Sequence, residues 1–369
     1  MRFTCYKNDL VEALQVAIRS VAVKPITQIL SGIYLRVDGR DLEMQANNFS
    51  TGIVIRVPVN VESEGEVVLS GKKFQEFVRN MPDETITLFG EEAATTFSME
   101  SGGAQIELLT MPASEFPKVK VPDTYGSFTI RSNVLKNLIR KTIFAVAKDD
   151  DRPVFRGCCF EIDGNKISLV ATNAQRIAIA KESLQHNDTN DNVSFVVPSE
   201  TLRYFNFDPN DVENTVEVKY SDRIVTFGYN NVYITSRLLE GGFPDYERVF
   251  QDEYTTHVKI NKAELRNAVD LIALTARESE FNMIKFDIMQ GRMEISAYSP
   301  DIGEARKNIE VETSGDMLEI AFNVDYLLDA LRVMDTPFVH MHLNGNNSPV
   351  LLSEPDNENY SYIITPVRI

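Results

Sequence analysis

The sequence predicts an α+β protein made of three tandem copies of one repeat. A short strand followed by an amphipathic helix occurs three times, at spacings of about 125 and 130 residues. Each copy then continues with the same alternating hairpin pattern. Because the joins between the predicted strands are short, we expect antiparallel pairing, with the apolar stripe of each helix covering one face of a sheet.

The first strand and helix are clearest in the second copy. The strand is Phe128–Arg131, and the helix is expected over Arg131–Lys148 with Ser132 as its N-cap. The same pattern follows the strands Met1–Cys5 and His257–Ile260. Apolar residues at helical spacing form one stripe in each copy: Leu10, Leu14 and Ile18; Leu135, Leu138, Ile139 and Ile143; Leu265, Val269 and Ala273.

An alternating hairpin comes next in each repeat. Its turn is Asp38-Gly39 in the first copy and Asp163-Gly164 in the second, and Asp-Gly between alternating runs is a strong hairpin signal. In the third copy the turn surrounds Gly291. The paired strands are expected at Ile33–Val37 and Leu42–Ala46, at Cys158–Ile162 and Ile167–Ala171, and at Met283–Ile288 and Met293–Ala297.

A second helix and a set of closing strands complete each repeat. The second helices are expected to begin at Gly71, Ser199 and Asn323, each directly after an apolar strand. The closing strands are expected at Ile86–Phe89, Thr96–Met99 and Ile106–Thr110; at Thr215–Tyr220, Ile224–Tyr229 and Val232–Arg237; and at Val339–Leu343, Val350–Ser353 and Tyr360–Pro366. Linkers near residues 120 and 250 divide the chain into domains over residues 1–120, 121–250 and 251–369.

Composition favours a cytoplasmic protein. The 369 residues include no apolar run as long as a membrane span or a signal peptide. Three cysteines, Cys5, Cys158 and Cys159, are too few for a disulfide framework, so buried reduced thiols are expected. No membrane partner is expected.

Charge is sorted along the sequence. The formal net charge is -17, yet the predicted helix Arg131–Lys148 has five basic residues and no acidic one. Together the six predicted helices carry +8, which leaves -25 on the remaining residues. If the helices share one surface, that surface attracts a polyanion such as DNA, and the acidic sheet side repels it.

Enzyme motifs are absent from the sequence. It contains no P-loop, no GxGxxG after a strand and no HExxH. His340 and His342 share one strand face, but the sequence shows no third ligand beside them, so neither a metal nor a cofactor is expected. The remaining alternative to DNA binding is a peptide-binding scaffold that never encloses DNA, and that alternative predicts no basic bias on the helices.

Several short motifs are spaced along the whole chain. They are Met1-Arg2-Phe3-Thr4, Lys24-Pro25, Ala171-Thr172 with Arg176, Phe243-Pro244-Asp245-Tyr246, Phe322-Asn323-Val324 with Tyr326, and Thr365-Pro366-Val367-Arg368-Ile369. In these motifs and in its threefold repeat, the chain resembles the bacterial DNA polymerase III β subunits, the sliding clamps. The resemblance implies a non-catalytic processivity factor: a head-to-tail homodimeric ring with helices lining the hole and sheets outside, which encircles duplex DNA and slides without sequence specificity.

By this resemblance and the helix pattern, one set of basic residues faces DNA. The family implies Lys24, Lys72, Lys73 and Lys148, and the helices add Lys136, Arg140, Lys141 and Arg203. The chain departs from the family pattern at Asp149–Asp151 and Pro153-Val154, where three acids and no aromatic ring occur. We therefore expect no DNA contact from that segment.

The resemblance also implies an apolar pocket between the second and third domains. It would receive the short linear peptides of the replicative polymerase, the clamp loader, repair polymerases, and mismatch-repair and ligase proteins. Phe155, Ile177 and Val367 could equally be core residues. The matching positions are Arg152, Phe155, Thr172, Ala174, Gln175, Arg176, Ile177, Pro244, Arg248, Val249, Asn323, Tyr326, Pro349, Val350, Ile363, Thr365, Pro366, Val367 and Arg368.

The third implied site is the dimer joint. The strand with Ile106 and Leu108 would pair with the third domain of a second copy near Leu274. On the sequence alone, Ile106 and Leu108 could also be ordinary core residues, and three repeats would also fit a larger ring or a self-closed monomer. A dimer of this kind would act at the nucleoid, in the cytoplasm.

Overall fold

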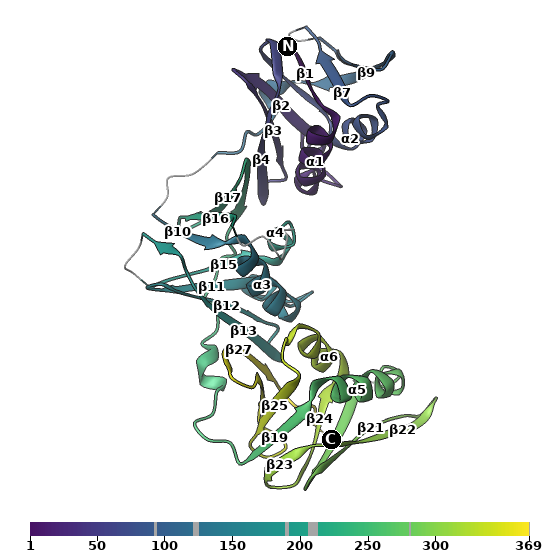
Figure 1. Ribbon diagram of the computed structural model, residues 1–369, viewed down its shortest axis with the longest axis vertical. Helices are drawn as coiled ribbons and strands as arrows, with labels where there is room; N and C mark the ends of the chain where they lie inside the picture. Colours follow the sequence, from purple (N-terminus) through teal and green to yellow (C-terminus); the bar gives the residue numbers. More distant parts are fainter. Residues whose placement is uncertain (92–93, 121–124, 189–191, 206–212, 280–281, 369) are drawn as a thin grey trace. The chain divides into compact units, whose positions relative to one another are not determined.

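The computed structural model describes residues 1–91, 94–120, 125–188, 192–205, 213–279 and 282–368. It divides into two compact units (Figure 1). The first comprises Met1–Ser132, Gln185–Thr189 and Arg203–Leu238, and the second comprises Asn133–Leu184, Asn190–Leu202 and Leu239–Ile369. The boundary passes through the middle third of the chain, whose strands are divided between the two units.

The first unit is built on one antiparallel sheet. Within the described residues its strand order is β14-β10-β16-β17-β18-β4-β3-β2-β6-β9-β8-β7-β1-β5. Helices α1 (Lys7–Ala17) and α2 (Gly71–Asn80) lie side by side against it (Figure 1). The strands are β1 (Arg2–Tyr6), β2 (Gly32–Asp38), β3 (Asp41–Asn47), β4 (Thr51–Pro58), β5 (Asn60–Ser63), β6 (Gly65–Ser70), β7 (Thr85–Phe89), β8 (Thr96–Ser101), β9 (Ala104–Met111), β10 (Gly126–Arg131), β14 (His186–Asn187), β16 (Thr215–Tyr220), β17 (Ile224–Tyr229) and β18 (Val232–Arg237).

The second unit contains two antiparallel sheets, in the orders β15-β11-β12-β13-β27-β26-β25-β19-β23 and β22-β21-β20-β24. Its helices are α3 (Ser132–Thr142), α4 (Ser199–Leu202), α5 (Lys262–Ala276) and α6 (Val324–Val333). Its strands are β11 (Gly157–Asp163), β12 (Lys166–Thr172), β13 (Arg176–Ser183), β15 (Val193–Pro198), β19 (Thr256–Asn261), β20 (Met283–Met289), β21 (Arg292–Ser299), β22 (Gly303–Glu310), β23 (Glu312–Gly315), β24 (Leu318–Asn323), β25 (Phe338–Leu343), β26 (Val350–Glu354) and β27 (Asn357–Ile364).

The predicted hairpins are confirmed. β2 pairs with β3, β11 with β12, and β20 with β21, all antiparallel. Gly39 and Gly164 have φ values of 70° and 55°, a left-handed conformation that glycine adopts without steric cost. The Asp-Gly signal therefore located both turns.

Two strands in each repeat were not predicted: the short strands β5, β14 and β23, and the longer strands β4, β13 and β22. β4, β13 and β22 each follow the hairpin and extend its sheet. β4 also pairs with β18 of the second repeat, and β13 pairs with β27 of the third. Within the described residues β22 pairs with β21 alone, so it forms the edge of its sheet.

The helices are shorter than predicted, and they therefore carry a smaller net positive charge than the sequence analysis assigned to them. α1 ends at Ala17 and α3 at Thr142, each followed by a 3-10 turn, so Lys24 and Lys148 lie beyond them. α4 has only four residues, and the expected end of that helix at Asn206 lies outside the described residues. Within these bounds the six helices carry a net charge of +2 instead of +8, because α2 and α3 together carry +5 and the other four helices together carry -3.

The cores bury the predicted stripes and thiols. Leu10, Leu14, Leu135 and Leu265 are fully buried, and all three cysteines are buried and free. Asn261 caps α5, because its side chain accepts a hydrogen bond from the backbone N of Glu264 at 3.1 Å. Among the described residues no helix is long and apolar enough to cross a membrane.

Candidate functional site

Arg176 is the centre of a polar arrangement in the second unit. It begins β13, and its side chain is buried. The guanidinium donates to Asp329 Oδ2 at 2.7 Å and to the backbone O of Phe144 at 2.5 Å, and it lies 4.3 Å from the ring centroid of Tyr326. Its Nε is buried and has no hydrogen-bond partner among the described residues. Burial closes this N–H to an incoming ligand, so Arg176 acts by fixing the positions of Asp329 and Tyr326.

The turn before Arg176 is held by its own side chains. Asn173 Oδ1 accepts from the backbone N of Gln175 and of Arg176, both at 3.1 Å. Thr172 Oγ1 donates to Arg176 O at 2.8 Å. Ala174 therefore sits at a φ of 72°, which is unusual for a residue with a Cβ. Asn173-Ala174-Gln175 thus forms an ordered turn.

Gln175 connects this turn to α6 and to the C-terminal segment. Its Oε1 accepts from the Tyr326 hydroxyl at 2.8 Å. Its backbone O accepts from both N and Oγ1 of Thr365, each at 2.9 Å. Asn323, also among the predicted pocket residues, caps α6 by accepting from the backbone N of Asp325 and Tyr326. These hydrogen bonds bring together predicted residues that are up to 190 positions apart in sequence.

An apolar cluster lies on the same sheet. Phe155, Ile177 and Ile363 are buried in it, and Val249 packs against it from the segment that follows β18. Arg152 covers the Phe155 ring, with the guanidinium carbon 4.0 Å from the ring centroid. In this chain Phe155 and Ile177 are therefore core residues, and their role in a peptide pocket stays a prediction.

The remaining predicted pocket residues lie at the ends of these elements. Val350 is buried and pairs with Ile364, and Pro349 precedes it. Val367 forms a bridge with Ala321, while Pro366 and Arg368 flank it. Pro244 and Arg248 are exposed, and Arg248 pairs with Asp245 at 2.6 Å. Ile369, the last residue of the family-like tail, lies outside the described residues.

The predicted DNA-facing residues fall into two groups. Lys24, Lys72, Lys73, Lys148 and Arg203 are exposed, and Lys136 is half-buried. Arg140 is engaged with Asp335 at 2.8 Å and with Val333 O at 3.1 Å.

Lys141 does not fit the predicted DNA set. Its side chain is only 7% exposed, and its Nζ lies 3.1 Å from both Glu354 Oε2 and Asp335 Oδ2. A buried ammonium that is already paired is unavailable to phosphate. Lys141 therefore joins α3 to β26 and has a structural role.

Sequence reasoning missed part of the exposed apolar surface. Leu274 on α5 is 67% exposed, as expected for an interface, but Leu271 on the same helix and Leu109 on β9 are also exposed. Leu108 is buried, and Ile106 is half-buried. Leu108, which the resemblance assigns to the dimer joint, is a core residue in this chain, and Leu109 is the leucine of β9 that faces solvent.

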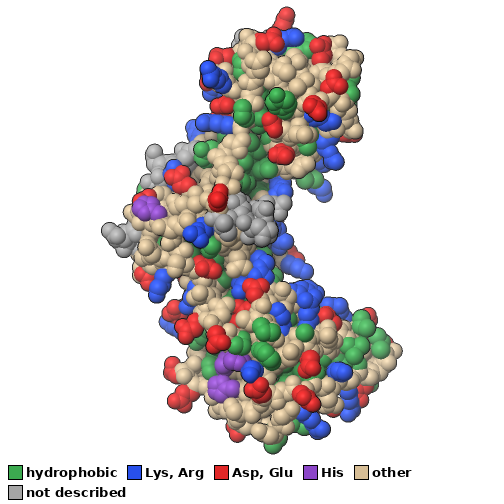
Figure 2. Space-filling model, in the orientation of Figure 1, with side chains coloured by type: hydrophobic (Ala, Val, Ile, Leu, Met, Phe, Trp, Pro, Cys, Tyr) green, Lys and Arg blue, Asp and Glu red, His purple; other side chains and the backbone are tan. Residues whose placement is uncertain are grey.

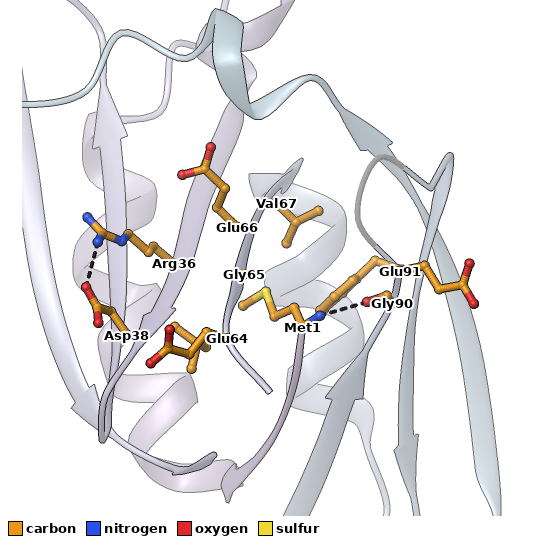
Figure 3. Close-up of a pocket in the computed structure, with 11 residues that line it drawn as sticks. Met1, Arg36, Asp38, Glu64, Gly65, Glu66, Val67, Gly90 and Glu91 are labelled. Carbon is orange, nitrogen blue, oxygen red and sulfur yellow. Dashed lines mark hydrogen bonds and ion pairs between the residues drawn. The ribbon is translucent and has the colours of Figure 1, made fainter. Parts of the chain in front are cut away.

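A cavity of about 400 Å³ lies near the N-terminus of the first unit (Figure 3). Its polar groups are paired within the chain: Arg36 with Asp38 at 2.6 Å, and the terminal amine of Met1 with Gly90 O at 3.0 Å. Glu66, on its wall, accepts from Tyr34 and Lys118. Such paired groups do not form a constellation for catalysis.

Comparison with known proteins identifies the chain. Models of the N-terminal, central and C-terminal domains of the DNA polymerase III beta subunit match residues 1–120, 129–245 and 247–368. The chain belongs to this family. The predicted fold class, three repeats of the clamp domain, is therefore confirmed, as is the predicted family.

Relatives of the sliding clamp family align over the whole chain. The beta sliding clamp of Staphylococcus aureus strain Mu50 is 28% identical over 377 residues, which cover 100% of this chain and 99% of the relative. The crystal structure of the Bacillus subtilis DNA polymerase sliding clamp has a TM-score of 0.95 at 28% identity and covers 100% and 99% of the two chains. That of the Pseudomonas aeruginosa clamp bound to griselimycin has a TM-score of 0.94 at 28% identity, with both chains fully covered. Members of this family are non-catalytic processivity subunits of DNA polymerase III, and so is this chain.

Proposed function

We propose that two copies of this chain close head to tail into a ring around duplex DNA. This proposal is supported by a pattern of strand pairing that recurs between successive repeats. The last strand of the second repeat, β18, pairs with β4 of the first, and the last strand of the third, β27, pairs with β13 of the second. By the same rule β9, the last strand of the first repeat, should pair with β22 of a third repeat.

Strands β9 and β22 each have a stretch of edge that pairs with no other strand among the described residues. β22 pairs only with β21 within the described residues, and Ala104–Leu109 of β9 pairs only with β8. Exposed edges of this kind are templates for pairing with another chain. Helix α5, with the exposed Leu271 and Leu274, packs on β22 and adds an apolar surface beside the open edge.

Leu274→Glu tests the joint, since a carboxylate buried against a partner is strongly unfavourable. In sedimentation equilibrium, wild type should have about twice the 41.7 kDa chain mass, and Leu274→Glu should approach the chain mass. Met317→Glu is the matched control, because Met317 is equally exposed but precedes β24 instead of flanking β22. A Leu274→Glu variant that stayed dimeric would contradict this joint.

The proposed DNA contacts are the exposed basic residues Lys24, Lys72, Lys73, Lys148 and Arg203, with the half-buried Lys136 and the ion-paired Arg140 beside them. Long cationic side chains attract phosphate without reading bases, which suits sliding. Changing Lys24, Lys72 and Lys148 to Glu should shorten retention on circular DNA and reduce its dependence on salt. The control changes Lys166, Lys181 and Arg223, which are also exposed, to Glu with the same charge difference. Equal losses in both variants would refute a specific DNA surface.

The third part of the proposal is peptide capture around Arg176 and Tyr326. Tyr326, partly exposed above the Arg176 guanidinium, and Val249, partly exposed against the buried cluster with Phe155 and Ile177, supply apolar surface for an anchor side chain. The proposed partners are the polymerase catalytic subunit, the clamp loader, and repair polymerases, mismatch-repair proteins and ligase with similar motifs. Their meeting place is the nucleoid.

Thr365→Arg tests this pocket. Thr365 is half-buried beside Gln175, and a bulky cation there should obstruct the pocket without entering the core. Fluorescence anisotropy with a labelled polymerase-derived peptide should show at least tenfold weaker binding. Met317→Glu, remote from this turn in sequence and structure, serves again as the control. Unchanged peptide affinity in Thr365→Arg would place the peptide elsewhere.

A further inference from the structure

One face of the nine-stranded sheet gathers three of the chain's four histidines. In the β19–β25 ladder His257 lies directly opposite His342. His340 lies two residues before His342, on the same face of β25. Histidine side chains form a patch on the surface of this unit (Figure 2). The predicted pair on β25 therefore gains a further imidazole from a neighbouring strand, which the sequence did not reveal.

The side chains of His257 and His342 approach each other through their Nδ1 atoms. Their Nδ1 atoms are 2.8 Å apart, so one donates a hydrogen bond and the other accepts it. The second nitrogen of His342, Nε2, lies 3.0 Å from Ser353 Oγ. With the Nε2–H donating to Ser353, the lone pair on Nδ1 of His342 points toward His257. An outer partner that fixes the tautomer in this way is typical of metal-binding histidines.

The histidine pair borders a space large enough for an ion. Beside the rings is a cavity of about 480 Å³, lined by all three histidines and by Lys259, Glu312 and Ser314. This space admits an ion with its remaining water ligands.

The separation of the two nitrogens favours one coordination geometry. Imidazole nitrogens bind divalent transition-metal ions at about 2.0–2.1 Å. Two of them in cis positions of a square-planar or tetragonal ion lie about 2.9 Å apart, whereas a tetrahedral ion separates them by about 3.3 Å. The 2.8 Å between the Nδ1 atoms is close to this cis separation, and on binding the ion replaces their hydrogen bond while the proton of His257 moves from Nδ1 to Nε2. Square-planar or tetragonal nitrogen sites are characteristic of Cu²⁺ and Ni²⁺.

We propose that His257 and His342 form a two-nitrogen clip for Cu²⁺, and more weakly for Ni²⁺, with water in the remaining positions. No group of three or more His, Cys, Asp or Glu side chains in the described ranges is arranged to hold a metal ion, so the clip uses two protein ligands. Neither histidine belongs to the proposed DNA or peptide sites.

The test is a Cu²⁺ titration of the full-length protein, followed by electron paramagnetic resonance. The first equivalent should show hyperfine coupling to two nitrogens. His257→Ala and His342→Asn should each weaken binding at least tenfold, and Ser353→Ala should weaken it less. His186→Ala is the matched control, because His186 is exposed on another strand and paired with Asp188.

Three results would overturn the proposal. The first is a first Cu²⁺ equivalent that couples to one nitrogen or to none. The second is an equal loss of affinity in the His186→Ala control. The third is loss of a nitrogen coupling in His340→Ala, which would move the site to the pair on β25. Circular dichroism on each variant separates lost ligands from lost fold.

Discussion

Replacing Lys141 by Met should destabilise the second unit and leave intrinsic DNA retention unchanged. The Lys141 ammonium and the Glu354 carboxylate, 3.1 Å apart, are buried: their side chains are 7% and 0% exposed. Removing one partner of a buried ion pair costs about 3–5 kcal/mol, because the other charge stays buried without compensation.

The hydrogen bonds of Glu354 determine how much stability each variant loses. Besides Lys141, the carboxylate accepts from the backbone N of Asp335 and Thr336 and from Asn357 Nδ2. After Lys141→Met these three donors remain, so the cost should lie near about 3 kcal/mol. After Glu354→Leu the ammonium loses its buried partner and two backbone N–H groups lose their acceptor, which adds about 1–3 kcal/mol for each orphaned group. Glu354→Leu should therefore be the more damaging change.

Urea unfolding followed by circular dichroism measures both variants, with Lys148→Met as the control. Lys148 is close to Lys141 in sequence but exposed, so Lys148→Met should change stability by less than about 0.5 kcal/mol and instead reduce DNA retention. The reverse pattern, a stable Lys141→Met that releases DNA, would refute the structural role of Lys141. In the double variant Lys141→Met/Glu354→Leu, the loss should be less than the sum of the single losses, since contacting residues couple.

Three further predictions concern local features. Ala174→Gly should raise the free energy of unfolding by about 0.5 kcal/mol, because relief of the positive φ outweighs the added entropy of the unfolded chain; an unchanged urea midpoint would argue against strain there. Asn323→Ala should cost about 1 kcal/mol by removing the cap of α6, which thermal melting can detect. His342 has a pKa in the folded state of about 4, below its value of 6.5 in the unfolded chain, so the free energy of unfolding should be highest above pH 6.5 and should fall as the pH drops toward about 4. Because the ring is only half-buried, the loss should be about 1–2 kcal/mol. The variant His342→Phe should remove this dependence on pH.

The fold could be predicted wherever one face of an element is buried. The hairpins around Gly39 and Gly164 combine an alternating pattern with a turn residue, and both signals are local. β22 was missed for the opposite reason. As the edge of its sheet it exposes most of its side chains, and Gly303–Glu310 contains almost no alternation to detect. Helix ends were overestimated because the 3-10 turns after Ala17 and Thr142 continue the apolar spacing.

The site could be predicted only as a set of residues. Lys141 and Lys148 look alike in the sequence, and what separates them is Glu354, more than 200 positions away. The unpartnered Nε of Arg176 likewise depends on where Asp329 and Phe144 accept from the other guanidinium nitrogens. Long-range contacts of this kind leave no periodic trace in the sequence.

The open edges also bear on how many copies close the ring. Three repeats can form three strand-pairing joints. Two of them form within the chain, between β18 and β4 and between β27 and β13. The third joint would need the open edges of β9 and β22, which do not pair with each other within the described residues. These edges must meet within the chain, in a second copy or in a longer series, and unlike edges always generate head-to-tail contacts. Small-angle X-ray scattering distinguishes the three cases by mass and internal distances. A particle of about twice 41.7 kDa with the distance distribution of a hollow body requires closure by two copies, whereas a compact particle of the chain mass would leave peptide capture as the principal function.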